Sequence, residues 1–172
     1  MLIKSFRLIN TIKHLKLIQL YYQLKYRIIS AKRKLNQFMT EMDLLEIDDF
    51  PNNNKVISFA ENEIEFTFLN KKKVFSRTNI DWSYSGDNLL LSYNMNYLDW
   101  LHQADIPHDV CISLLADYYQ TTSNNRILLH AYPTSLRVIN LSKFICKHKV
   151  TLHWLRNELM SDLELLRSRL EY

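Results

Sequence analysis

Glycine is almost absent from this chain: Gly86 is the only one among 172 residues. The P-loop and the dinucleotide fingerprint both need several glycines, because the backbone must approach the phosphates closely. The composition therefore excludes both kinds of phosphate-binding loop. We expect no nucleotide cofactor, and nothing else in the sequence indicates a cofactor of another kind.

Cysteine is equally scarce, with only Cys111 and Cys146. Two cysteines form neither the framework of a disulfide-rich secreted domain nor the spacing of a zinc site. Each lies within an apolar helical pattern, so we expect buried free thiols. Histidines and aspartates gather between residues 102 and 109, but no third well-spaced ligand accompanies them. The sequence therefore predicts no metal site.

Long apolar runs are missing as well. No stretch approaches the roughly 18–20 apolar residues that span a bilayer, and the charged opening residues lack the clean apolar segment of a secretory signal. A cytoplasmic location is the simplest interpretation. The chain is 47% hydrophobic and 23% charged, a composition typical of a globular domain with a real core.

Acidic residues are absent from residues 1–40, which carry nine lysines and arginines, whereas the rest of the chain has 13 basic and 18 acidic residues. A basic arm of this kind favours a polyanion or a membrane surface as partner, although a solvated helix face is the commoner explanation. Apolar residues at helical spacing predict one long basic helix over residues 8–35. Such a helix either packs on a domain or lies on a membrane.

Residues 56–75 carry the only strong strand pattern. Ile64, Phe66 and Phe68 alternate with polar residues, which is the period of a half-buried strand. Ile57 and Phe59 indicate a preceding strand, and residues 71–75 a third short one. We therefore expect a small antiparallel β element near residues 56–75.

Helical patterns return after residue 88 and continue to the end. The last is the most regular, and its leucines predict one apolar face: Leu152, Leu155, Leu159, Leu163, Leu166 and Leu170. No glycine, asparagine or proline stop signal closes this helix. We therefore expect a truncated polypeptide whose leucine face, from Leu155 onward, is exposed and promotes self-association. The alternative is that the basic helix covers this face.

Two blocks mix aromatic rings with polar groups: residues 93–98 (YNMNYL) and residues 131–137 (AYPTSLR). Aromatic rings stack on the apolar faces of sugars, while amide and guanidinium groups bind hydroxyls and carboxylates. The blocks therefore indicate a carbohydrate cleft. The candidate substrate-binding residues are Tyr93, Asn94, Asn96, Tyr132, Thr134, Ser135 and Arg137. The competing interpretation is structural: core aromatics, helix caps and an ion pair of Arg137.

The two blocks resemble segments of the amino-terminal region of heparinase II/III-like polysaccharide lyases, in the same order along the chain. Residues 131–137 are the most specific part of this resemblance, and residues 68–70, 80–82 and 15–27 are similar to other segments of that region. Asn96 stands where the family often has histidine, and Ala131 where it often has proline.

The resemblance implies a mainly α fold: a partial (α/α) toroid of helix pairs over residues 94–172, with the small antiparallel β element near residues 56–75. It implies that residues 1–172 form the amino-terminal, substrate-binding part of a lyase. Such lyases cleave uronate polymers such as heparan sulfate by β-elimination, in which a base removes a proton and a nearby group neutralises the carboxylate. The family's catalytic asparagine, tyrosine and histidines match no position here, so we expect no catalytic residue.

Three hypotheses about function follow. The first is the substrate-binding part of a lyase, whose partners are an acidic polysaccharide and the remainder of the enzyme. The second is a stand-alone carbohydrate-binding module. The third is a membrane-surface protein held by the basic helix, although a membrane is the less favoured partner. Nucleic acid is not expected to bind.

Overall fold

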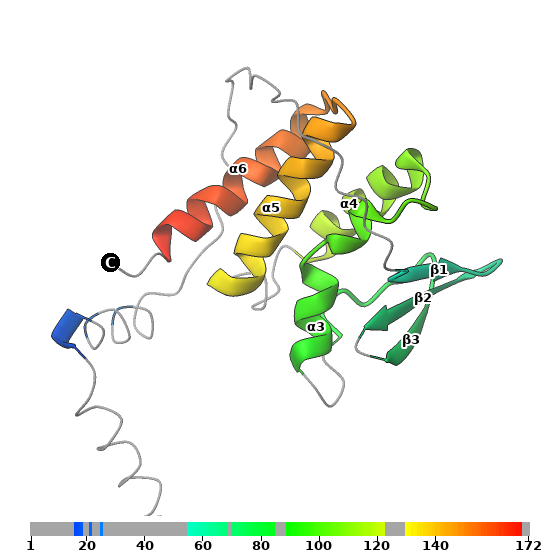
Figure 1. The fold of residues 1–172 in the computed structure, drawn as a ribbon, viewed down its shortest axis with the longest axis horizontal. Coiled ribbons are helices and arrows are strands. Elements are labelled where there is room, and N and C mark those ends of the chain that lie inside the picture. The colour runs from blue at the N-terminus through cyan, green and yellow to red at the C-terminus, as the bar shows by residue number, and fades with distance from the viewer. Residues whose placement is uncertain are drawn as a thin grey trace, which may run out of the picture.

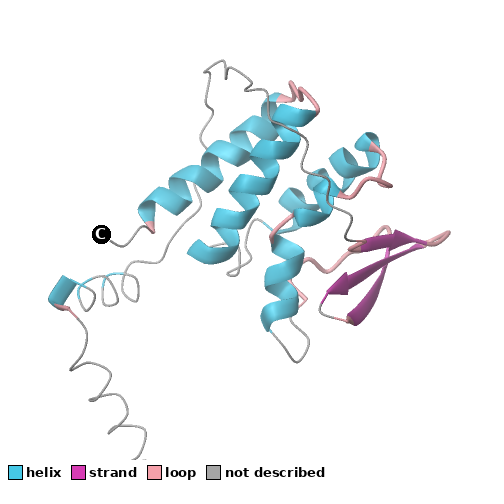
Figure 2. Cartoon of the chain, in the orientation of Figure 1, coloured by secondary structure: helices cyan, strands magenta, loops and turns pink. Residues whose placement is uncertain are grey.

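The computed structural model describes residues 16–18, 21, 25, 55–68, 70–84, 89–122 and 130–169. Within these ranges a small sheet lies beside a group of helices (Figures 1 and 2). None of these helices is both long and apolar enough to cross a bilayer. The elements are β1 Ile57–Phe59, β2 Glu63–Phe68, β3 Lys71–Ser76, α3 Leu89–Asn96, the 3-10 helix η1 Asp99–His102, α4 His108–Thr122, α5 Ala131–Lys147 and α6 His153–Ser168.

The three strands form one antiparallel sheet in the order β1-β2-β3, as the alternation over residues 56–75 predicts. Ile57 pairs with Phe66, and Ile64 pairs with Phe75, so the apolar side chains share one face. Gln103 closes part of the outer edge of β1: its Oε1 accepts the N–H of Ile57 at 2.8 Å, and its Nε2 donates to the carbonyl of the same residue at 2.7 Å. The sheet is thereby fixed to the segment that follows η1.

Aromatic side chains fill the space between the sheet and the helices. Trp82 stacks on Trp100 with ring centroids 5.9 Å apart, and it meets Phe66 and Tyr118 edge-on. The Trp82 indole N–H donates to Asp117 Oδ2 of α4 at 2.7 Å. These large rings bury much more area than aliphatic side chains. They make the sheet and α4 parts of one core.

The expected toroid of helix pairs is wrong for the helices that the structure describes. Only α5 and α6 pack along each other as a pair, whereas α3 contacts both the sheet and α5 (Figure 1). The reason is the aromatic core, because Phe66 and Trp82 bring the sheet against the helices as a structural layer of its own. The sheet is therefore not an accessory to an all-helical array.

The segment around Leu98 is not one continuous helix. The helix α3 ends at Asn96, Leu98 takes a left-handed conformation (φ 58°), and η1 begins at Asp99. Positive φ is unfavourable for leucine. Complete burial of the Leu98 side chain in the core offsets this cost. The break turns Tyr97 and Trp100 in different directions.

The predicted bare leucine face of the last helix is wrong at its amino-terminal end. Leu155 and Leu159 are buried in the core rather than exposed. Leu163 is 37% exposed, and its place on the inward face is taken by Asp162, which is buried. Leu166 is half-buried, and Leu170 lies outside the described residues. Burial of Leu155 and Leu159 reduces the apolar surface available for the predicted self-association through α6, which itself stays a prediction.

The basic helix expected over residues 8–35 lies almost wholly outside the described residues. Leu17, Ile18, Tyr21 and Lys25 are described and are helical. The alternative that the basic helix covers the leucines of α6 therefore also lies outside the described residues.

Candidate functional site

The seven candidate residues come from α3 and the first turns of α5, two helices that contact each other. The fold divides the candidates into two sets. Tyr93, Asn94, Tyr132 and Ser135 keep solvent-accessible surface, whereas Asn96, Thr134 and Arg137 are buried. One continuous groove lined by all seven is therefore not formed.

Tyr93 is positioned by a residue that the sequence analysis did not select. Its phenol oxygen lies 2.6 Å from Nδ1 of His130, and the two rings meet edge-on with centroids 5.7 Å apart. His130 is the residue that precedes α5 and is exposed. The pair therefore joins the middle of α3 to the start of α5 at the protein surface.

A second pair of rings lies between the same two segments. Tyr97 and Tyr132 meet edge-on with ring centroids 5.7 Å apart. Burial, and next the phenol of Tyr132, raise the pKa of Tyr97 to about 12, so this phenol is neutral at physiological pH. Tyr132 is 62% exposed. Tyr93, Tyr97, His130 and Tyr132 together are called the tyrosine surface below.

The polar side chains of Asn94 and Ser135 use part of their capacity within their own helices. Asn94 Nδ2 donates to the carbonyl of Leu90 at 2.7 Å, and Ser135 Oγ donates to the carbonyl of Tyr132 at 2.8 Å. Asn94 is partly exposed and uses only its Nδ2 in this bond, so its amide oxygen can accept a hydrogen bond from a ligand. Ser135 has only acceptor capacity left.

Arg137 does not belong to any open cleft. It is 0% exposed and forms a two-pronged ion pair with Asp162 of α6, with Nε–Oδ2 at 2.7 Å and Nη2–Oδ1 at 3.0 Å. Burial by itself lowers the pKa of an arginine, but the Asp162 carboxylate outweighs it, and the pKa of Arg137 lies above its usual range.

Two further residues complete this buried network. Thr134 Oγ1 accepts a hydrogen bond from Arg137 Nη2 at 3.2 Å, and the Tyr119 phenol donates to Asp162 Oδ2 at 3.0 Å. The network therefore joins α4, α5 and α6. The structural interpretation of Thr134 and Arg137 is the one that the fold supports.

Asn96 is likewise a core residue. Its Nδ2 donates to the carbonyls of Ser92 and Trp82 at 2.7 and 3.2 Å, and its Oδ1 accepts the phenol of Tyr118 at 2.8 Å. All its hydrogen-bonding capacity toward a sugar is thus used inside the protein. Asn96 holds the end of α3 against the aromatic core.

Asp99 lies beside the tyrosine surface and was also missed by the sequence analysis. Burial raises the pKa of its carboxyl to about 6, although backbone hydrogen bonds oppose the shift. Its Oδ1 is buried without a partner among the residues that the structure describes. Burial, and next the charge of Lys143, lower the pKa of the neighbouring His102. Perturbed titratable groups of this kind occur often at functional sites.

The histidines and aspartates between residues 102 and 109 do not gather around one point. The ring of His108 stacks on Phe144 with centroids 5.4 Å apart and lies next to His148. Asp105 accepts a hydrogen bond from Gln103 and forms an ion pair with Lys55 at 3.2 Å. No group of three metal-ligating side chains occurs in the part of the chain that the structure describes.

Both cysteines are free thiols, and they lie in α4 and α5. Burial, and next the charge of Asp109, raise the pKa of Cys111 to about 11. A thiol in this state is a poor nucleophile, because the thiolate is the reactive form. Cys111 is a packing residue of α4.

Comparison with known proteins gives no family for this chain: no family model matches it, and neither a curated protein nor a solved structure is similar to it.

Proposed function

We propose that this chain binds an acidic, uronate-containing polysaccharide at the tyrosine surface and does not cleave it. The observation that carries the proposal is the exposed Tyr132 ring next to the Tyr93–His130 pair, at a place where two helices meet. The proposal keeps the carbohydrate recognition implied by the two aromatic-polar blocks. It assigns that recognition to the members of the blocks that reach solvent.

The ring of Tyr132 supplies an apolar platform for a sugar. Its edge contact with Tyr97 holds the ring in place, and a rigid aromatic side chain loses little conformational entropy when a ligand binds. The amide oxygen of Asn94 and the phenols of the tyrosine surface are suitable partners for sugar hydroxyls. Stacking and hydrogen bonding together favour a carbohydrate over a purely apolar ligand.

An acidic sugar fits because the surface includes the start of α5. His130, the N-cap residue, makes no side-chain cap hydrogen bond. The backbone N–H groups of Ala131 and Tyr132 in the first turn therefore favour a negative charge, whereas Pro133 has no N–H to contribute. The Nδ1 atom of His130 faces Tyr93, so Nε2 is the ring atom that remains for a ligand. A uronate carboxylate is therefore expected between the start of α5 and the His130 ring.

Binding without cleavage is proposed because proton abstraction beside a uronate needs a base together with a group that neutralises the carboxylate. Arg137, the strongest candidate for neutralisation, is fully buried and bonded to Asp162. This argument is the same for a stand-alone carbohydrate-binding module and for the substrate-binding part of a lyase. The purified chain should produce no rise in ultraviolet absorbance from unsaturated uronate when it is incubated with heparan sulfate.

Calorimetric titration with heparan sulfate fragments tests the binding proposal. Tyr132→Ala is expected to weaken binding about tenfold, which corresponds to about 1.4 kcal/mol. Leu163→Ala is the matched control, because it shortens an exposed apolar side chain on another helix. Its affinity should equal that of the unmodified chain. Equal affinities of all three proteins, or no binding by any of them, would show that the tyrosine surface is not the site.

The membrane-surface alternative is tested by co-sedimentation with vesicles that contain anionic lipid. The present proposal expects the chain to remain in the supernatant. If the vesicles retain the unmodified chain and Tyr132→Ala to the same extent, while heparan sulfate is not bound, the membrane alternative replaces the proposal.

A further inference from the structure

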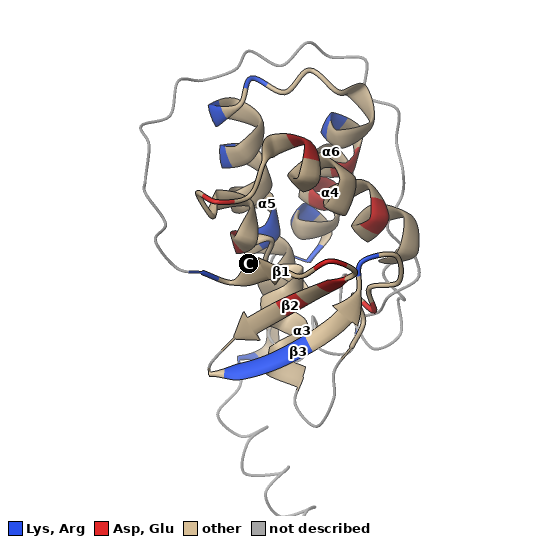
Figure 3. Cartoon of the chain, turned by 90° about the vertical axis from the view of Figure 1, so that its right-hand side faces the viewer, with Lys and Arg blue, Asp and Glu red and all other residues tan. Residues whose placement is uncertain are grey.

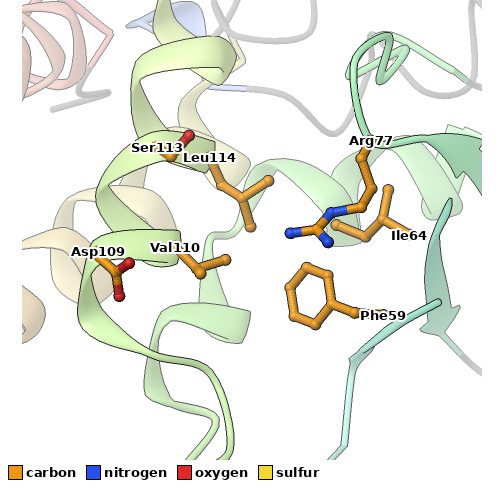
Figure 4. A pocket seen from close by; sticks show the side chains of 7 residues that line it. All are labelled: Phe59, Ile64, Arg77, Asp109, Val110, Ser113 and Leu114. Atoms are coloured by element: carbon orange, nitrogen blue, oxygen red, sulfur yellow. The ribbon is translucent and has the colours of Figure 1, made fainter. Parts of the chain in front are cut away.

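A cavity of about 250 Å³ lies between the β1–β2 hairpin and α4, away from the tyrosine surface. Its lining combines apolar and charged side chains: Phe59, Ile64, Arg77, Asp109, Val110, Ser113 and Leu114. Figure 4 shows Val110 and Leu114 pointing from α4 toward the sheet, and the Arg77 guanidinium reaching toward α4 from the other side. The lining of the cavity is therefore mixed, with apolar side chains on both sides and a cation at one wall.

Arg77 is exposed, and two contacts place it beside the cavity. Its backbone N–H donates to the carbonyl of Asn62 at 3.0 Å, and its guanidinium carbon lies 5.2 Å from the centroid of the Phe59 ring. Stacking on an aromatic face orients the planar guanidinium without using its N–H donors. Arg77 forms no ion pair with any other residue that the structure describes. Its two-pronged donor edge is thus available for a carboxylate.

The apolar walls and Asp109 restrict the ligand further. Phe59 is 37% exposed and Val110 is half-buried, so their side chains supply apolar surface for a hydrocarbon or aromatic group, with a small contribution from Leu114. The carboxylate of Asp109, on the opposite wall, opposes a second negative charge in the ligand. A phosphate ester or a sulfated sugar therefore fits poorly. The volume is below that of a typical drug-sized pocket.

We propose that this cavity is a binding site for a small monocarboxylic acid with an apolar body, of the size of phenylacetate. The carboxylate binds the guanidinium of Arg77 with two hydrogen bonds. The apolar body lies against Phe59, Val110 and Leu114. This site is separate from the proposed polysaccharide surface and does not depend on it.

Titration of the ¹⁵N-labelled chain with phenylacetate, followed by amide chemical shifts, tests the proposal. Shifts should be confined to residues around 59–64, 77 and 109–114, with a dissociation constant of about 1 mM for so small a ligand. Phenylacetamide, which has the same shape without the charge, should bind about tenfold more weakly, because hydrogen bonds between two charged groups are stronger than those to a neutral amide.

Arg77→Gln should remove the preference for the acid over the amide, so that both bind equally weakly. Lys71→Gln is the matched control: it removes one positive charge from an exposed position of β3, and it should keep the preference. The same spectra show whether each variant is folded. Shifts that are absent from the cavity, or an equal response to acid and amide in the unmodified chain, would overturn the proposal.

Discussion

The first turns of α5 have an inner and an outer face, and the polar residues on the two faces differ in burial and in hydrogen-bond partners. Thr134 and Arg137 lie on the inner face and have their polar atoms bonded inside the protein. Tyr132 and Ser135 lie on the outer face, where Tyr132 reaches solvent. The two faces come from one block of seven residues. What distinguishes them is a partner on another helix, because Asp162 of α6 draws Arg137 inward.

A second comparison concerns two buried carboxylates. Asp162 has a guanidinium and a phenol as partners, whereas Asp99 has a buried oxygen without one among the described residues. A paired buried charge is tolerated, but an unpaired one carries most of its desolvation cost. The two carboxylates should therefore respond oppositely when each is neutralised.

The largest expected effect on stability comes from a substitution on the inner face of α5. Arg137→Met leaves Asp162 charged and buried without its cation, so it should lower the free energy of unfolding by about 3–5 kcal/mol. The double variant Arg137→Met with Asp162→Leu removes both charges and should recover most of this loss. Urea denaturation followed by circular dichroism measures both values. Equal losses for the single and the double variant would mean that the pair is not a coupled unit.

Removal of the Asp99 charge should have the opposite effect and raise the free energy of unfolding. Asp99→Asn keeps an acceptor for the backbone hydrogen bonds but removes the charge. The pKa of Asp99 rises from about 3.8 to about 6 on folding, so its favourable contribution is complete below the unfolded pKa and is lost as pH rises through the folded value.

Relative to the unmodified chain, Asp99→Asn should therefore gain about 2 kcal/mol in the free energy of unfolding between pH 4 and pH 7. Urea denaturation at several pH values measures the difference, with Glu61→Gln as an exposed control. A difference that is constant across this range would contradict the assignment of a raised pKa to Asp99.

The two faces can be separated by substituting one residue on each, Thr134 and Tyr132, which are two positions apart at the start of α5. Thr134→Val keeps the shape of the side chain but removes the acceptor for Arg137 Nη2, and it should cost about 1–2 kcal/mol of stability. It should leave the affinity for heparan sulfate unchanged. Tyr132→Ala should do the reverse, with a stability change within about 0.5 kcal/mol, as expected for an exposed position. If both substitutions affect the same property, the division of α5 into two faces is wrong.

The sheet could be predicted from the sequence because a strand pattern has a period of two, and Ile64, Phe66 and Phe68 follow it without interruption. The arrangement of the helices could not. An apolar face shows that a helix is covered but does not show by what. Here Trp82 and Phe66 bring the sheet into contact with the helices, and the helices that the structure describes do not form the toroid expected from the resemblance.

Similar ambiguities limit how far the candidate site can be predicted from the sequence. Both Asp162 and Leu163 fit helical spacing from Leu159, so only the position of Arg137 decides which of them turns inward. His130 lies 37 residues from Tyr93, and no local pattern joins them. Its position just before a predicted helix was the one signal in the sequence that could have indicated a role in positioning the site.

The smallest effect on stability and on heparan sulfate binding is expected from substitution of Ser135, on the outer face of α5. Its hydroxyl donates to the carbonyl of Tyr132 within the helix, so removal exposes no buried polar group. Ser135→Ala should change stability by less than about 0.5 kcal/mol, as expected for a surface substitution. The affinity for heparan sulfate should stay within about twofold, because the hydroxyl has no proton left to donate to a sugar.

Asn94→Ala is the comparison, because it removes an amide oxygen that is left for a ligand, and it should weaken binding more. If Ser135→Ala weakens binding as much as Tyr132→Ala does, the ligand contacts the hydroxyl directly, and the site extends further along α5 than the tyrosine surface.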